Sequence, residues 1–264
     1  MSNLHDEIKE LQERWNELQC MIDLIDDKHT PPERQTIYLK AAFLMLCSHF
    51  EGGFYDILRA ILNDINDAGN YTCLPPTLVK AYIKYSMFDD PNVKSTVVDK
   101  ISDELHEQKV NLRIKDDFLN HSSNLTPKTV KQCCQYFSVP DITKTVLGSD
   151  FEIVFQNNPK DSSSFINEEI RTLSNATRAF PYNIDQDRHQ LKNTKNTSLF
   201  TTFLINLMGE RNRAVHGGTM SGNNLTSQEL KDDLLKIQSF TLAEIYCFGC
   251  KIQSNYKAEA EHTE

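Results

Sequence analysis

Residues 199–216 read LFTTFLINLMGERNRAVH, an apolar run that ends in a cluster of polar groups. Its apolar side chains recur at helical spacing, so the stretch predicts an α-helix with one face in a protein core. The end of this helix places Arg211, Asn212 and His216 within about 8 Å along the axis, at 1.5 Å per residue. A guanidinium keeps its charge and binds phosphate, and an imidazole titrates near neutral pH. The stretch therefore predicts a helix with a candidate catalytic site at its C-terminal end.

The polar groups divide between two faces of this helix. At about 100° per residue, Asn212 and His216 share one face. A separate stripe carries Leu204, Met208, Arg211 and Val215. Arg211 thus stands where an apolar residue is expected, and it needs a partner because an unpaired buried charge is very costly. Glu51, beside the apolar face of an earlier helix, is the best candidate, and such a pair would also be explained by helix packing alone.

Arg211 and His216 point about 140° apart on the same helix. A single chain therefore places them awkwardly for one site. Two copies of the helix that meet across a two-fold axis would surround one cleft with both groups. The spacing favours a homodimer with a shared active site.

The composition of the 264 residues is that of an ordinary globular protein, with 39% hydrophobic and 25% charged residues. Nine glycines and nine prolines are few for this length, which favours helices over a turn-rich β fold. No apolar run approaches the length of about 18 residues that a membrane helix needs, and the acidic N-terminus is unlike a signal peptide. Seven cysteines at irregular spacings indicate free thiols in a reducing cytoplasm. No second ligand pair joins Cys247 and Cys250, so we expect no metal and no cofactor.

The net charge of −9 argues against a general nucleic-acid coat protein, because phosphate binding is mostly electrostatic. The charge is uneven, however, since residues 188–216 carry five Lys and Arg side chains against the single carboxylate of Glu210. A local basic patch suits a site that meets a few phosphates. Three of these residues are candidate RNA contacts, although a solvated surface explains them as well: Lys192, Lys195 and Arg213.

Periodicity and capping signals predict helices along most of the chain. The predicted helices comprise residues 4–25, 33–67, 76–88, 93–120, 127–137 after an N-cap at Thr126, 167–179, 185–192, 198–215 and 227–254. Residues 151–155 alternate like a strand but would form only a minor element, and residues 157–164 resemble a polar loop. The pair Gly52-Gly53 predicts a close approach by another helix or another chain. The expected fold is all-α, a helical bundle with an irregular, mostly helical middle insertion.

The pattern Arg211-Asn212-x-x-x-His216, followed by Gly217 and Gly218, resembles the signature of the HEPN superfamily. Residues 44–54, LMLCSHFEGGF, resemble the early HEPN helix in which an apolar run precedes a glutamate, here Glu51. The resemblance covers roughly residues 35–68 and 185–253. It implies a single HEPN-like helical domain over residues 1–264, with a core of about 4–68 and 185–254 and an insertion of about 69–184.

The resemblance also implies a function. Many HEPN proteins are metal-independent endoribonucleases with a composite site at a homodimer interface, and they serve as toxins or antiviral-defence effectors. In such a site His216 would be the acid and base, Arg211 would stabilise charge on the phosphate, and Asn212 and Glu51 would position these groups. The expected partners are RNA, a second copy of the chain, and an antitoxin or regulatory protein. Two alternatives remain open, a non-catalytic module that binds RNA or a nucleotide, and a structural subunit of a toxin–antitoxin pair.

Overall fold

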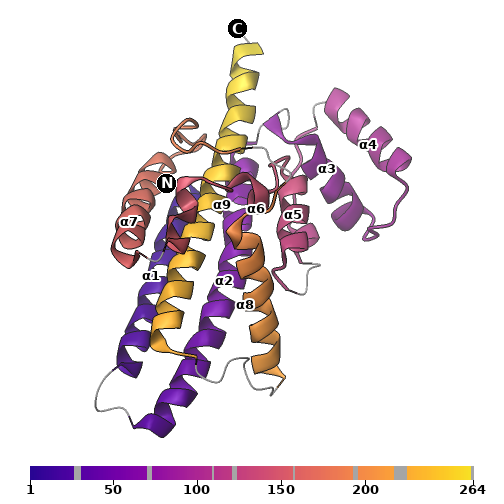
Figure 1. The fold of residues 1–264 in the computed structure, drawn as a ribbon. Helices are drawn as coiled ribbons and strands as arrows, with labels where there is room; N and C mark the ends of the chain where they lie inside the picture. The colour runs from indigo at the N-terminus through magenta and orange to yellow at the C-terminus, as the bar shows by residue number, and fades with distance from the viewer. Residues whose placement is uncertain are drawn as a thin grey trace.

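The computed structural model describes residues 1–26, 31–69, 73–108, 110–120, 124–156, 158–192, 196–216 and 225–262. The regular elements in these residues are all helices, which confirms the predicted all-α class (Figure 1). None of the helices in the described part of the chain combines the length and the hydrophobicity that a membrane span requires.

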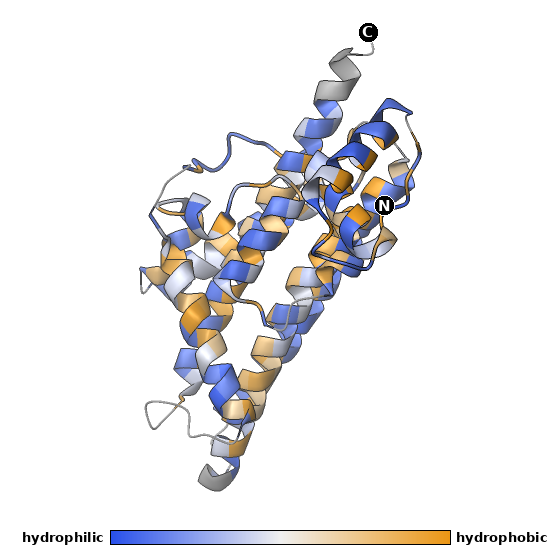
Figure 2. Ribbon diagram, turned by 90° about the vertical axis from the view of Figure 1, so that its right-hand side faces the viewer, coloured by the Kyte–Doolittle hydropathy of each residue, from blue (hydrophilic) through white to orange (hydrophobic). Residues whose placement is uncertain are grey.

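Four long helices form the bundle. They are α1 (Asn3–Ile25), α2 (Pro32–Ala68), α8 (Leu199–Val215) and α9 (Ser227–His262). The helix α2 packs against the other three, so it is the central element that the sequence predicts. Figure 2 shows hydrophobic and hydrophilic residues interleaved along these helices, as expected when one side of each helix is buried. Helix α9 continues eight residues beyond the predicted end at Ser254.

The glycine pair in α2 is explained in part by α1 of the same chain. A Cβ atom added to Gly53 would lie 2.8 Å from Cδ2 of Leu11 in α1, which is closer than real Cβ contacts. Gly53 therefore allows α1 and α2 to pack closely. The predicted close approach is confirmed at Gly53, and its partner is a helix of the same chain.

The middle of the chain forms shorter helices beside the bundle. They are α3 (Pro76–Tyr82), which continues as the π-helix η2 (Ile83–Met87), α4 (Ser95–Glu107), the 3₁₀ helix η3 (Asp117–Leu119), α5 (Pro127–Tyr136), α6 (Ile142–Thr145), the 3₁₀ helix η4 (Asp150–Phe155) and α7 (Pro159–Ala176). In Figure 1, α3, α4 and α5 lie on one side of the bundle and α7 on the other. The predicted N-cap of α5 is present, because the Thr126 hydroxyl accepts a hydrogen bond from the backbone N–H of Thr129 at 3.3 Å.

Three predictions in this middle part were wrong in extent or type. The helix predicted over 93–120 ends at Glu107, and residues 110–115 form no regular secondary structure. The side chain of Asn66 in α2 holds this segment, donating to the carbonyl of Ile114 at 2.9 Å and accepting from its N–H at 2.8 Å. Residues 150–155 form a 3₁₀ helix rather than a strand-like element. Most of the predicted loop 157–164 belongs to α7, which begins at Pro159.

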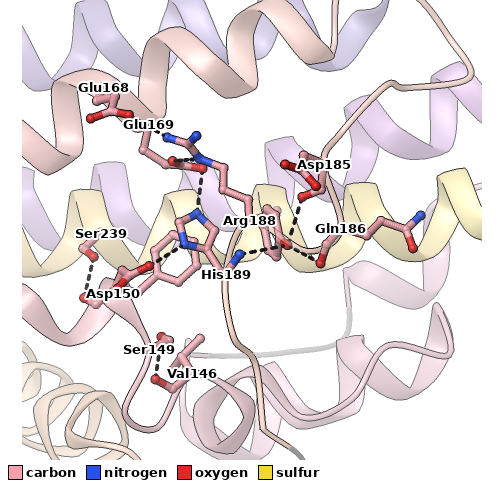
Figure 3. A network of polar contacts seen from close by, with 12 residues as sticks. Val146, Ser149, Asp150, Glu168, Glu169, Asp185, Gln186, Arg188, His189 and Ser239 are labelled. Atoms are coloured by element: carbon pink, nitrogen blue, oxygen red, sulfur yellow. Dashed lines mark hydrogen bonds and ion pairs between the residues drawn. The ribbon is translucent and has the colours of Figure 1, made fainter.

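The helix predicted over 185–192 is also absent, and tertiary polar contacts replace it (Figure 3). The hydroxyl of Tyr246 in α9 lies 3.1 Å from the carbonyl oxygen of Asp185 and 2.8 Å from that of Gln186, and can donate to either. The backbone N–H of His189 donates to the same hydroxyl at 3.4 Å. The Tyr246 side chain therefore forms hydrogen bonds with backbone groups that would otherwise form them within a helix.

Candidate active site

Helix α8 carries the predicted cluster and is anchored by its apolar face. Phe200, Leu204 and Met208 are buried. At the start of the helix the hydroxyl of Ser198 donates to the backbone carbonyl of Thr143 at 2.6 Å. The helix ends at Val215 as predicted, but this side chain is 53% exposed and does not continue the buried stripe.

Arg211 is paired with Glu51, as the sequence predicts. Nη2 of Arg211 lies 3.4 Å from Oε2 of Glu51, which joins α8 to α2. Nη1 donates to Oδ1 of Asn124 at 3.0 Å and to Oδ1 of Asn212 at 3.2 Å. The Arg211 side chain is 29% exposed and that of Glu51 is 17% exposed, so this is a pair at the edge of the core. The guanidinium is thus held by its neighbours and remains open to solvent.

Two residues of the middle segment complete this arrangement, and sequence reasoning missed both. Asn124 supplies the acceptor to Arg211, and the backbone N–H of Leu125 donates to Oε1 of Glu51 at 2.9 Å. Both residues directly precede the Thr126 cap of α5, inside the predicted insertion 69–184. The cap motif predicts a helix start at this point, but no pattern in the sequence connects it with Glu51 or Arg211.

His216 caps the end of α8 and is exposed. Its backbone N–H donates to the carbonyl of Asn212 at 3.1 Å. Within the described residues, no hydrogen bond joins the His216 ring to Arg211, Asn212 or Glu51. One chain therefore brings together Arg211, Asn212 and Glu51, while His216 is exposed at the end of the helix.

The three predicted RNA contacts are Arg213, Lys192 and Lys195. Arg213 is exposed and forms an ion pair with Glu210 one turn earlier in α8, with 3.3 Å between Nε and Oε2. Lys192 is exposed, and its backbone N–H donates to the carbonyl of Thr145 at 3.2 Å. Lys195 and the glycines at 217 and 218 lie outside the described residues. In the part of the chain that the structure describes, no group of three or more His, Cys, Asp and Glu side chains could hold a metal ion.

A second polar cluster surrounds His189, which the sequence leaves without a partner (Figure 3). Its Nδ1 lies 3.1 Å from Oδ2 of Asp150 and its Nε2 lies 3.0 Å from Oε1 of Glu169, a contact without good hydrogen-bond angles. Nε of Arg188 donates to the other oxygen of Glu169 at 2.9 Å. Burial alone would lower the pKa of His189, but the close contacts and charges of Glu169 and Asp150 outweigh it and raise that pKa. The ring is only 3% exposed, so this cluster is closed to a polymer substrate.

Comparison with known proteins identifies one family. The family model described as RiboL-PSP-HEPN matches residues 9–243. The match includes Glu51, Arg211 and His216, and it runs through the middle segment that carries Asn124. No curated protein and no solved structure matched the chain.

Proposed function

Because the chain belongs to the RiboL-PSP-HEPN family of the HEPN superfamily, we propose that it is a metal-independent endoribonuclease. The observation that carries the proposal is the position of Arg211. Its guanidinium is held by Glu51 and Asn124, is partly open to solvent, and lies on the same helix as the exposed His216, five residues earlier. A fixed cation can stabilise the charge that develops on a phosphate, and an imidazole can act as a general acid and base.

The proposed reaction is an internal transfer at one phosphate of RNA. The imidazole of His216 removes the proton of a ribose 2′-hydroxyl, and the 2′-oxygen attacks the adjacent phosphorus. The bond from phosphorus to the 5′-oxygen breaks, and that oxygen takes a proton from the imidazolium of His216. The products are a 2′,3′-cyclic phosphate and a 5′-hydroxyl end.

Arg211 has donors left for the phosphate in this reaction. A guanidinium has five N–H donors, and the described residues supply acceptors at Glu51, Asn124 and Asn212. The remaining N–H groups can bind the phosphoryl oxygens, whose charge grows in the transition state. In this proposal Glu51, Asn124 and Asn212 are positioning residues, because they fix the direction of the guanidinium.

The experiment that tests this function uses purified protein, mixed RNAs and EDTA. We expect cleavage to persist in EDTA, because the proposed groups are an imidazole and a guanidinium. The fragments should carry 2′,3′-cyclic phosphate and 5′-hydroxyl ends. Strict dependence on Mg²⁺ or Mn²⁺ would contradict the mechanism, and RNA binding without cleavage would favour a non-catalytic module. Because HEPN relatives commonly act in this way, we also propose a role as a toxin or antiviral-defence effector.

We further propose that the active unit is a two-fold homodimer in which the α8 helices face each other. The side of α8 that carries His216 also carries Ile205, which is 57% exposed, and Gly209, where an added Cβ would meet nothing within 4 Å. The missing side chain at Gly209 allows a second helix to approach closely, and burial of the exposed Ile205 in that contact would favour it. Arg211 lies about 140° away, so the partner's copy of the helix supplies the second group of each site. Gly53 does not contribute, because it packs against Leu11 of its own chain.

Mixing two inactive variants tests the shared site. Arg211→Ala and His216→Ala proteins should each be inactive, whereas a mixture allowed to exchange subunits should recover partial activity. Recovery is expected because each heterodimer keeps one site with both groups intact. The measurement is RNA cleavage before and after exchange, with Arg211→Ala alone put through the same exchange as the control. A protein that is monomeric at micromolar concentration would contradict the dimer.

A further inference from the structure

A pocket lined by charged side chains of both signs lies along α2 beyond the candidate active site. It has a volume of about 400 Å³ and is lined by Arg59, Leu62, Asn63 and Asn66 of α2 and by residues 113–117. We call it the α2 pocket. Its charged lining consists of Arg59, Arg113, Lys115, Asp116 and Asp117.

The two hydrogen bonds between Asn66 and the backbone of Ile114 build one wall of this pocket. They fix the segment on α2 at Ile114, whose side chain is buried, with 2% exposed. Arg113 and Lys115, on either side of Ile114, are both exposed.

The charge balance of the pocket leaves two cations for a ligand. Arg59 is already compensated, because it donates to Asp116 at 2.9 Å, to Asp56 at 3.1 Å and to Asn120 at 2.9 Å. The charge of Asp116 is compensated by this ion pair with Arg59. Among the described residues, Arg113 and Lys115 form no ion pair within 4.0 Å. The only other lining carboxylate in this pocket is that of Asp117.

The α2 pocket lies further along α2 than the candidate active site. Glu51, Tyr55 and Arg59 follow one another at one-turn spacing, so about 12 Å of helix axis separates the first from the last. The side chains of Tyr55 and Arg59 also interact, since Cζ of Arg59 lies 6.0 Å from the centre of the Tyr55 ring. A polymer that places one phosphate at Arg211 can therefore follow α2 and reach the pocket within a few nucleotides.

We propose that the α2 pocket binds the phosphodiester backbone of single-stranded RNA a few nucleotides away from the bond that is cleaved. The inference rests on the proposed ribonuclease function. On a protein with a net charge of −9, two neighbouring cations on a backbone segment fixed at Ile114 would favour one path for the chain of phosphates. With this pocket, the enzyme should bind and cleave oligonucleotides in preference to dinucleotides.

Charge reversal at the pocket tests the proposal. The variant is Arg113→Glu with Lys115→Glu, and the matched control is Lys160→Glu with Arg171→Glu. The control changes the net charge equally, at exposed positions of α7 on the far side of the bundle (Figure 1). The probe is a single-stranded RNA of about 12 nucleotides. The pocket variant should bind it roughly tenfold more weakly, with a smaller salt dependence, because two phosphate contacts are lost. The control should bind like the parent.

Cleavage of a dinucleotide separates the pocket from the active site. The pocket variant should keep the parent kcat/KM on a dinucleotide, because that substrate does not reach α2 beyond Tyr55. The milder Arg113→Gln with Lys115→Gln variant should lie between the parent and the charge reversal. An equal loss of RNA affinity in the α7 control, or parent-like RNA binding by the pocket variant, would contradict the role of the pocket but not the proposed ribonuclease function. A parent protein that neither binds nor cleaves RNA would overturn the proposed function as well.

Discussion

Replacement of His216 by alanine is expected to lower the rate of RNA cleavage by about 10²–10⁴-fold, the usual contribution of a general acid or base. The loss should fall on kcat, because the imidazole moves protons and the guanidinium of Arg211 remains to bind the phosphate. Fold and dimer should be kept, since the exposed ring lies at the end of α8. Single-turnover cleavage and thermal unfolding measure the two effects separately.

The control for this variant is His106→Ala, which removes another exposed histidine, on α4. It should cleave RNA like the parent. Normal cleavage by His216→Ala would rule out the proposed mechanism, and loss of RNA affinity without loss of the chemical step would assign His216 to binding.

The second large effect is expected at Glu169, whose side chain is fully buried between Arg188 and His189. Glu169→Ala should lower the free energy of unfolding by about 3 kcal/mol, the low end for removal of one partner from a buried pair. The low end applies because Arg188 keeps its ion pair with Glu168 at 3.0 Å. A loss of this size should lower Tm by roughly 5–10 °C in a chain of this length. Glu168→Ala, at a carboxylate 60% exposed, is the matched control and should cost less than about 1 kcal/mol.

The pH dependence of the stability of the parent and of Glu169→Ala identifies the cause of this loss. The raised pKa of His189 means that its charged form stabilises the folded state fully below the ordinary value of about 6.5. This contribution is lost as pH rises through the raised pKa. The difference in stability between the parent and Glu169→Ala should therefore shrink as pH rises. Glu7, whose pKa burial raises to about 7, titrates in the same direction but does so in both proteins. A difference that does not vary with pH would show that Glu169 acts through Arg188 alone.

The sequence predicts the parts of the fold that depend on local pattern. Helices α1, α2 and α8 follow from apolar spacing, and Arg211 in an apolar stripe correctly predicts a partner on α2. Remote contacts decide the features that were missed. Residues 185–192 are polar and helix-compatible, yet Tyr246 in α9 takes up their backbone groups. Likewise Asn124 reaches Arg211 across 87 positions of sequence, which no periodicity encodes.

Those separations have a consequence for the timing of synthesis. Arg211 is made 160 residues after Glu51, and a ribosome adds about 5–20 residues per second, so the interval is on the order of 10–30 s. Asn124 is made 87 residues before Arg211, so Glu51 and Asn124 are both in the chain before the guanidinium that they hold exists. A nascent chain therefore lacks this paired guanidinium until Arg211 has been added. If the protein cleaves RNA, a chain cannot act before its messenger has been translated through this position.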